Sequence, residues 1–490
     1  MDRRLLLLLW VVGALAMVVV VDSTNPGLQM KVTENGLKYV SEVGVELLKK
    51  DLADVKIPDI SGDTDVDVIG HVTYELKNLK ITSLDLPDAT ISTVSDTGLK
   101  ASIANAKIGI HGDWSYHNHG FIHISDHGSV DVTASSITLT LVIQVGDKSG
   151  QFTISTSESE CSFNVGSLDV DFHGGASWLY NLFKGTIGDE IQKDLNKEMC
   201  GEIIKEINGE LAEDVADIKL VSNIDDYAYV DYSLVAPPKF SNQSLRSFHK
   251  GEILSRKDHQ DVPVPAPPIP ADTETSRMVY LWLTEYASAS AAYVYYKAGV
   301  LQYNVTNDMV PSPFSLNTSK FPFNSVIPQI EKYYPNLEMV IDGKVTGPPV
   351  LNMTTGGLKG SLVGLLDFYA IQKNKTQTFL FSLTVSMSLS ASVSVNTKTN
   401  AITGNFTLDS SSFKLAKSAP ILGDISANIK NLDKLMNMLI GILMPQLNAK
   451  GAEGLPIPSV DGIELVKPKI SFGKGFILIA TDINYTVAIE

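Results

Sequence analysis

The chain has 490 residues, of which 44% are hydrophobic and 19% charged, and its formal net charge is -16. This apolar content argues against intrinsic disorder, and the length is enough for two separate hydrophobic cores. The acidic balance argues against a general binder of polyanions, so we expect no nucleic-acid partner.

The first 23 residues have the composition of a secretory signal peptide. Arg3 and Arg4 form a positive end, and an apolar stretch of 17 residues runs from Leu5 to Val21. That stretch is slightly long for a signal and short for a membrane-spanning helix, so a retained anchor is the alternative. We predict cleavage after Ser23 and a secreted, extracellular protein.

The mature chain opens with an alternating strand that ends at Thr33, where we expect the hydroxyl group to cap a helix. The helix is indicated by apolar residues at helical spacing, and Pro58 ends it. These positions are Leu37, Val40, Gly44, Leu47, Leu48 and Leu52. From Val66 to about Ser155 the chain is typical of repeated strands, with β-branched runs between Gly, Asp and Ser.

A second helical pattern follows Ser177, with an apolar residue at every fourth position as far as Leu211. This stripe predicts an amphipathic helix of about eight turns. Its first turns carry Leu179, Leu182 and Phe183.

The sequence has two cysteines, Cys161 and Cys200, which pair most simply in an oxidising compartment. We therefore predict one disulfide between the strand region and the second helix. Seven Asn-x-Ser/Thr sequons support a secreted glycoprotein. They are Asn242, Asn304, Asn317, Asn352, Asn374, Asn405 and Asn484.

A proline run at 262–270 divides the chain into two halves that begin alike. It favours an extended, fairly stiff conformer without sheet hydrogen bonds. After it, an apolar run meets Thr284, a second expected cap. A helix of about 285–297 follows, then strands from 300 to about 413, a helix of roughly 432–447, and final strands at 470–472 and 476–480.

Each half therefore combines long amphipathic helices with an antiparallel sheet, which is an α+β fold. Helices laid along a curved sheet enclose an elongated apolar interior. This interior is either an ordinary packed core or a tunnel for acyl chains, and periodicity leaves both interpretations open.

Short motifs run in order along nearly the whole mature chain. They are Asn25-Pro26-Gly27, Gly36-Leu37-Lys38-Tyr39, Lys56-Ile57-Pro58-Asp59, Leu234-Val235-Ala236-Pro237-Pro238, Arg277-Met278-Val279-Tyr280-Leu281, Asp308-Met309-Val310-Pro311 and Leu455-Pro456-Ile457-Pro458. With the cysteine spacing, this series resembles the lipopolysaccharide-binding protein family, which includes bactericidal/permeability-increasing protein and the plasma phospholipid and cholesteryl ester transfer proteins.

The resemblance implies an elongated boomerang of two similar barrels joined by a central sheet. We accordingly expect a signal at 1–23, an N-terminal lipid-binding barrel at 24–250, a proline-rich linker at 251–276 and a C-terminal barrel at 277–490. It also implies one apolar lipid pocket in each half. In the first half the walls would include Leu37, Val40, Gly44, Leu47, Leu48, Leu179, Leu182 and Phe183.

The chain departs from the family at the tip of the first barrel. Bactericidal and lipopolysaccharide-binding members carry Lys and Arg there, which can pair with lipid phosphates. The matching segment, 108–128, has no Lys or Arg. It carries instead five histidines, His111, His117, His119, His123 and His127.

Three interpretations of these histidines stay open. They form a solvated polar hairpin, a surface that contacts lipid headgroups in a pH-dependent way, or a metal site. No cysteine or carboxylate spacing completes a zinc set, and Asp63-x-Asp65-x-Asp67 lacks the glycine and glutamate of an EF-hand loop, so we predict no metal.

The sequence lacks the nucleophile-elbow, phosphate-loop and zinc-protease motifs, so we expect a binding protein and not an enzyme. We expect a monomer with no cofactor beyond bound phospholipid. The first functional hypothesis is uptake of lipopolysaccharide or a related bacterial amphiphile in innate defence, at a bacterial outer membrane. The alternative is a host phospholipid carrier or transfer protein acting at lipid particles.

Overall fold

The computed structural model describes residues 25–53, 59–66, 70–119, 125–174, 177–241, 243–272, 274–457 and 463–485. The predicted signal peptide, His123 and Asn242 lie outside these residues. So do the side chains of five predicted pocket residues, Leu47, Leu48, Leu179, Leu182 and Phe183.

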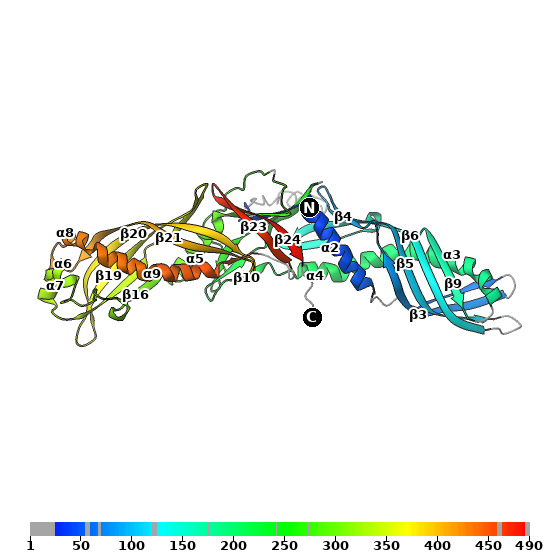
Figure 1. The fold of residues 1–490 in the computed structure, drawn as a ribbon, viewed down its shortest axis with the longest axis horizontal. Coiled ribbons are helices and arrows are strands. Elements are labelled where there is room, and N and C mark those ends of the chain that lie inside the picture. Colours follow the sequence, from blue (N-terminus) through cyan, green and yellow to red (C-terminus); the bar gives the residue numbers. More distant parts are fainter. Residues whose placement is uncertain are drawn as a thin grey trace, which may run out of the picture.

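The molecule is elongated, with one lobe at each end and a sheet between them (Figure 1). The first and last described strands of the chain both belong to the sheet between the lobes, near the middle of the long axis. Each lobe pairs a curled antiparallel sheet with a long helix, which confirms the predicted α+β fold of two similar halves joined by a central sheet.

The central sheet is built from both halves of the chain. Its six strands, in spatial order, are β12 (Leu234–Ser241), β13 (Ser244–His249), β1 (Leu28–Thr33), β15 (Val279–Thr284), β24 (Phe476–Tyr485) and β23 (Ile463–Gly473). At its centre β1 and β15 pair antiparallel, with Met30 opposite Leu281. Each half thus contributes its first strand and a later hairpin, and the two halves are related by an approximate local two-fold axis.

The two threonines that end β1 and β15 show this symmetry in their hydrogen bonds. The Thr33 amide donates to the Met278 carbonyl, and the Thr284 amide donates to the Gly27 carbonyl, both at 2.9 Å. The predicted cap at Thr284 is wrong, because its hydroxyl donates to the Gly27 carbonyl (3.0 Å) and caps no helix amide. The Thr33 hydroxyl donates to the Arg277 carbonyl (2.8 Å) and also accepts from the Gly36 amide in the first turn of the helix that follows (3.5 Å), so the predicted cap at Thr33 is confirmed.

The first lobe holds the predicted strand region and the first two helices. Its sheet contains β2 (Ile60–Val66), β3 (Gly70–Asp85), β4 (Thr90–Val94), β5 (Gly98–Asn118), β6 (Ser125–Lys148), β7 (Gln151–Ser155), β8 (Cys161–Asn164) and β9 (Ser167–His173). Its helices are α2 (Glu34–Ala53), α3 (Ser177–Glu206) and α4 (Ala212–Ala216). The predicted unbroken helix to Leu211 is therefore wrong at its end, because a π-helical turn at Ile207–Leu211 with a non-helical Gly209 interrupts it.

A small sheet follows α4 in the chain and packs against the helix Glu285–Lys297 of the second half. It consists of β10 (Val221–Asn223), β11 (Ala228–Asp231) and β14 (Glu252–Ser255).

The second lobe repeats the order of helix, sheet and helix. Its strands are β16 (Gln302–Val305), β17 (Glu338–Val345), β18 (Val350–Thr354), β19 (Gly357–Ile371), β20 (Gln377–Asn396), β21 (Ala401–Ser418) and β22 (Leu455–Pro456). Its helices are α5 (Glu285–Lys297), α6 (Phe323–Val326), α7 (Pro328–Tyr333), α8 (Ser426–Ile429) and α9 (Asp433–Glu453). The bounds of α5 agree with the prediction, and Gly299 follows it at a φ of 71°, where glycine is favoured. The short helices α6 and α7 were not predicted within the strand region.

Each long helix is fastened to its sheet by an asparagine. In the first lobe the Asn208 side chain pairs with both backbone groups of Thr156, accepting from its amide at 2.9 Å and donating to its carbonyl at 3.0 Å. In the second lobe Asn448 of α9 pairs with Phe406 of β21 in the same way, at 2.6 and 3.1 Å. The two side-chain amides satisfy the backbone N–H and C=O groups of Thr156 and Phe406. These hydrogen bonds fix the position of each helical segment relative to its sheet.

The proline run packs against the molecule along its length. Val262 is buried, and Val264 and Ala266 contact the core under the central sheet. The Val262 amide donates to the buried Glu252 carboxylate at 2.7 Å, and the Ala266 carbonyl accepts from Asn25 at 3.0 Å. The run is therefore a docked crossing between the halves.

Candidate functional site

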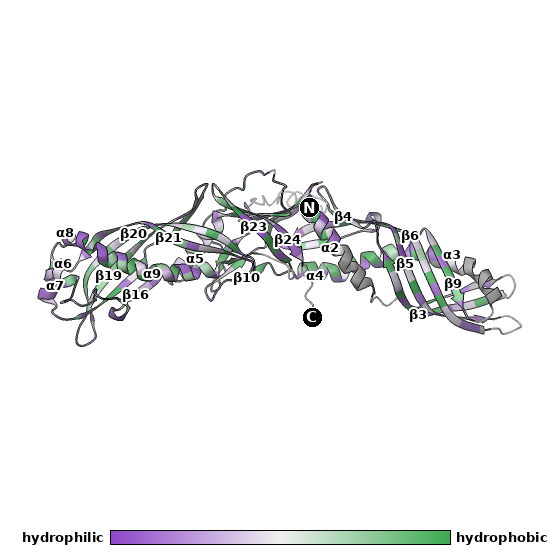
Figure 2. Ribbon diagram, viewed as in Figure 1, coloured by the Kyte–Doolittle hydropathy of each residue, from purple (hydrophilic) through white to green (hydrophobic). Residues whose placement is uncertain are grey.

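The inner face of the first-lobe sheet carries apolar side chains that remain half-buried. Toward the tip, inward residues such as Val72, Val130 and Val170 form a closed core. Midway along β5 and β6 the alternation continues, and here four inward side chains keep part of their surface accessible, while Leu141 between them is buried. These half-buried residues are Leu99, Ile103, Leu139 and Ile143. Colouring by hydropathy shows the same alternation along these strands (Figure 2).

The second lobe has a matching section. A closed core lies at its far end, around Phe323, Phe368 and Phe381. Nearer the centre, half-buried apolar side chains of the sheet share a face with that core, and α9 adds more. They are Leu358, Leu362, Met387, Phe406 and Leu408 on the strands and Ile442, Leu443 and Leu447 on the helix. Apolar surface left accessible between a helix and a sheet can be covered by an acyl chain.

The predicted pocket residues of α2 divide into two groups. Leu37 is buried, and a side chain at Gly44 would meet Ile91 of β4 at 3.8 Å. The Ser41 hydroxyl, on the same helix face, accepts from the Ile91 amide at 2.8 Å. Val40 lies 43% exposed, on the flank of this contact. The structure therefore brings Leu37 and Gly44 to the packed side of α2 but not Val40.

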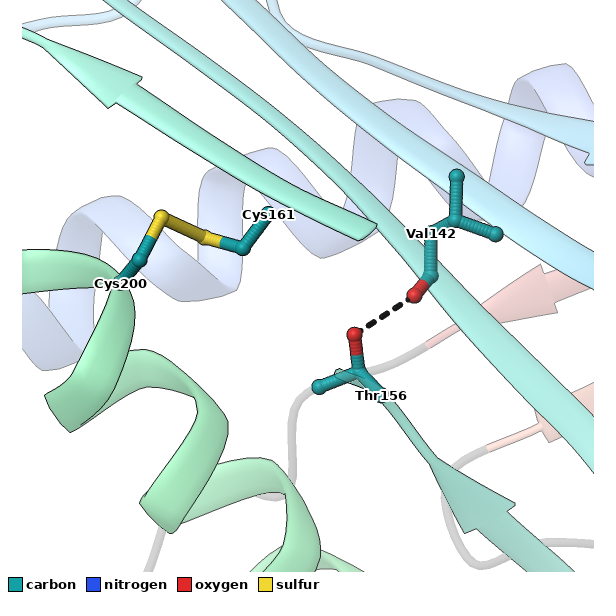
Figure 3. Close-up of a disulfide and its surroundings, with 4 residues drawn as sticks. All are labelled: Val142, Thr156, Cys161 and Cys200. Atoms are coloured by element: carbon teal, nitrogen blue, oxygen red, sulfur yellow. Dashed lines mark hydrogen bonds between the residues drawn. A yellow bond between two sulfur atoms is a disulfide. The ribbon is translucent and has the colours of Figure 1, made fainter. Parts of the chain in front are cut away.

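The predicted disulfide is present and joins β8 to α3 (Figure 3). Close by, the buried Thr156 hydroxyl donates to the Val142 carbonyl of β6 at 2.7 Å. Together with the Asn208 clamp, the Cys161–Cys200 bond holds the C-terminal half of α3 against the sheet that carries the half-buried apolar section.

A separate pocket of about 480 Å³ lies where the turn after β4 meets β6 and β7. Its lining is mostly polar, so it does not fit an acyl chain. The lining residues are Asp96, Thr97, Gln144, Val145, Gly146, Thr153 and Ser155.

The outer face of the same sheet carries most of the histidines. On β5 the odd-numbered residues from His111 to His117 point away from the core, since Trp114 and Tyr116 between them are buried. Strand register brings two further histidines onto this face. Thr73 lies opposite His117, so His71, two residues before Thr73, points to the same side. His173 lies opposite Ser129, which in turn lies opposite the outward-facing Asp113. The outer face thus holds six described histidines, His71, His111, His117, His119, His127 and His173.

Several of these histidines pair with carboxylates. Asp131 binds two of them, with His111 Nδ1 at 2.7 Å and His173 Nε2 at 2.8 Å. The hydrogen bond from His111, and then that from His173, lowers the pKa of the Asp131 carboxyl. At the sheet end, His71 lies 3.0 Å from Asp65, and His119 lies 2.7 Å from the Thr73 hydroxyl.

Two members of this face, His71 and His173, were not predicted from the sequence. They lie far along the chain from the histidine run at 111–127, and strand pairing alone brings them together. Period-two alternation before and after that run was the one signal that could have found them.

The described part of the chain shows no group of three or more metal-binding side chains able to hold an ion, and no helix long and apolar enough to cross a membrane.

The described sequons differ in accessibility. Asn317 is 9% exposed, and its side-chain oxygen accepts from the Ser319 amide at 2.9 Å. The other five described sequon asparagines are exposed, namely Asn304, Asn352, Asn374, Asn405 and Asn484.

These features define a two-lobed protein whose lobes each hold an apolar interior between a curled sheet and a long helix. Two family models match the chain, the N-terminal domain of the LBP / BPI / CETP family over residues 36–213 and its C-terminal domain over residues 222–485. The chain belongs to this LBP/BPI/CETP family.

Relatives match over almost their whole length. The bactericidal permeability-increasing protein of Sebastes schlegelii is 32% identical over 468 residues, covering 95% of this chain and 96% of that protein. The lipopolysaccharide-binding protein of Homo sapiens is 29% identical over 463 residues, covering 94% of each. A crystal structure of lipopolysaccharide binding protein superposes with a TM-score of 0.62 at 28% identity, covering 95% of this chain and 100% of that one.

Proposed function

We propose that this protein is a secreted binder of lipopolysaccharide or related bacterial amphiphiles in innate defence, which takes acyl chains into the apolar interiors of its two lobes. The observation that carries the proposal is the half-buried apolar section on the inner face of each sheet. Each buried methylene group would contribute about 0.8 kcal/mol, so a few acyl chains supply ample affinity. The names of the relatives support lipopolysaccharide as the ligand.

The remaining functional assignments belong to this proposal. The protein acts as a binder and not as an enzyme, works as a monomer, and carries phospholipid when no bacterial ligand is present. Its pocket walls include Leu37, Gly44, Leu47 and Leu48 of α2 and Leu179, Leu182 and Phe183 of α3, and the exposed sequons carry sugar. The domain limits of 24–250 and 277–490, with a linker at 251–276, also stay part of the proposal. Of the five tip histidines predicted above, His117, His119 and His127 are its pH-dependent headgroup contacts, whereas His111 is engaged by Asp131.

One strand of the first lobe offers a matched pair of test variants. Leu139 and Thr138 are neighbours on β6 and face opposite sides of the sheet, Leu139 toward the half-buried section and Thr138 toward solvent. Because a carboxylate inside the acyl site would be desolvated, Leu139→Asp should weaken binding of radiolabelled lipopolysaccharide at least about tenfold. Thr138→Asp should bind like the parent protein, and circular dichroism melts would check that both variants fold.

Extraction of the purified secreted protein with organic solvent distinguishes the proposed function from the alternative, a host phospholipid carrier. The proposal expects co-purified phospholipid that lipopolysaccharide displaces. Phospholipid that lipopolysaccharide does not displace would instead favour the carrier, and equal binding by the two aspartate variants would overturn the site.

A further inference from the structure

We propose that the histidine-bearing outer face of the first lobe is a docking surface for the phosphate groups of an anionic lipid surface. It repels such a surface at neutral pH and binds it in mild acid. The proposal rests on the proposed function, because it adds a second contact to a lipid-binding protein. It concerns the outside of the sheet, whereas the acyl chains enter its inside.

The contact region is the end of this face nearest the β5–β6 turn, which we call the distal histidine face. Its histidines lie on three adjacent strands, with His71 on β3, His117 on β5 with His119 directly after it, and His127 on β6. Thr73 stands opposite His117, and Ser115 stands opposite His127, so the imidazoles occupy neighbouring rows. The His71 and His119 rings are 6.0 Å apart. All four side chains are exposed.

The charged groups facing these imidazoles are three carboxylates and one lysine. Strand β2 contributes Asp63 and Asp65, and β3 contributes Glu75. Asp63 accepts from the Thr73 hydroxyl at 2.7 Å, and Asp65 lies 3.0 Å from His71. Lys77 pairs with Glu75 at 2.6 Å. Three carboxylates and this lysine carry two net negative charges beside neutral imidazoles and repel an anionic membrane, whereas four imidazolium groups would leave two net positive charges.

The same face continues toward the centre with charges of both signs. His111 and His173 are engaged by Asp131, so we place them outside the contact region. The other charged groups on this part of the face are Asp59, Lys80, Asp113, Asp169 and Asp171. Over the whole face, eight carboxylates and two lysines give six net negative charges, and six imidazolium groups would cancel them.

The pH dependence follows from the residue type. Imidazole is the side chain that changes charge between about pH 5 and 8, and its protonated form donates two charge-assisted hydrogen bonds. Phosphate oxygens are strong acceptors for such bonds. Acidification therefore removes the repulsion and supplies the donors at once, on a surface where the described residues hold no metal group.

The test measures co-sedimentation of the intact protein with vesicles at about pH 7.5 and about pH 5.5. Vesicles of phosphatidylcholine with phosphatidylglycerol are compared with phosphatidylcholine alone. Binding to the anionic vesicles should rise about tenfold or more on acidification, and high salt should abolish the gain. The quadruple variant H71Q/H117Q/H119Q/H127Q keeps every carboxylate and should lose the gain. His259→Gln, which removes an exposed histidine outside this face, should keep it.

Each other outcome overturns the docking surface. An equal gain in the quadruple variant would assign the effect to other groups, and an equal gain on phosphatidylcholine alone would assign it to apolar contact. Competition by millimolar-range free inorganic phosphate would identify a small-anion site in place of a lipid surface. Lipopolysaccharide uptake by the quadruple variant at neutral pH is measured in parallel, so a failure of the proposed function would show there while a failure of the docking surface would show only in the acid arm.

Discussion

The buried histidine His249 makes the stability of the central sheet depend on pH. His249, at the end of β13, is 3% exposed. Its Nδ1 lies 2.7 Å from the Tyr232 carbonyl and must donate, while its Nε2 lies 2.8 Å from the Ser247 hydroxyl, which leaves Nε2 as the acceptor of a neutral ring. Burial lowers the pKa of His249, and the Tyr232 carbonyl opposes this only in part.

The sign of the pH effect on stability follows directly. A folded-state pKa below the unfolded value of about 6.5 means that the unfolded chain takes up the proton first. The contribution of His249 is therefore complete above about pH 6.5 and is lost as the pH falls toward its folded pKa, at up to about 1.4 kcal/mol per pH unit. We expect His249→Gln to cost about 1–3 kcal/mol at neutral pH and to flatten the acid dependence of urea unfolding. His259→Gln should leave the profile unchanged, and an unaltered slope in the His249 variant would contradict this assignment.

At the scale of the elements, sequence patterns predicted the features that depend on neighbouring residues, such as the bounds of a helix, and not the contacts between distant parts of the chain. The bounds of α5 agree with the predicted helix of about 285–297, and Gly299 just after it has a positive φ. The hydroxyl of Thr284 could not be placed in this way, because its partner carbonyl belongs to Gly27, in the other half of the chain. The clamps of Asn208 and Asn448 were invisible for the same reason: an asparagine in a helix pattern does not state which strand lies beneath it.

The candidate site shows the same division. The strand character of the region that holds β5 and β6 was predicted from its β-branched runs. The half-buried state of Leu99 and Leu139 was not predicted, since accessibility depends on how closely a helix approaches the sheet. The run from His111 to His127 was visible in the sequence, whereas the contribution of His173 required the register of β6 with β9.

The disulfide is an element-scale constraint that can be tested separately from the global fold. It closes a loop with a sequence separation of 39 residues, for which chain entropy predicts roughly 4 kcal/mol. We expect C161A/C200A to lose about that much stability and to raise hydrogen exchange along α3 while α9 keeps its protection. Asn208 still holds the chain just after α3, so hydrogen exchange should increase most from the start of α3 to Cys200. Uniform loss of protection in both lobes would contradict a local role.

At the scale of the whole molecule, the approximate two-fold arrangement of β1 and β15 makes the central sheet common to both halves. The crossing that the proline run provides is anchored at both ends. At its start Asp261 pairs with Lys250 at 2.6 Å, and past its end Asp272 pairs with Lys31 at 3.1 Å and with Arg246 at 3.0 Å. A docked crossing and a shared sheet together argue that the lobes do not move independently.

The two anchors provide a matched comparison, because both are aspartate–lysine pairs on one crossing and they differ in burial. The side chains of Lys31 and Asp272 are 4% and 7% exposed, whereas that of Asp261 is 75% exposed. Removing one partner of a buried pair leaves an uncompensated charge, so Asp272→Ala should cost about 3–5 kcal/mol in urea unfolding. Exposed pairs contribute roughly 0–1 kcal/mol, so Asp261→Ala should remain close to the parent protein. Limited proteolysis within the crossing should accelerate in the first variant alone, and equal behaviour of the two variants would show that the crossing does not hold the lobes together.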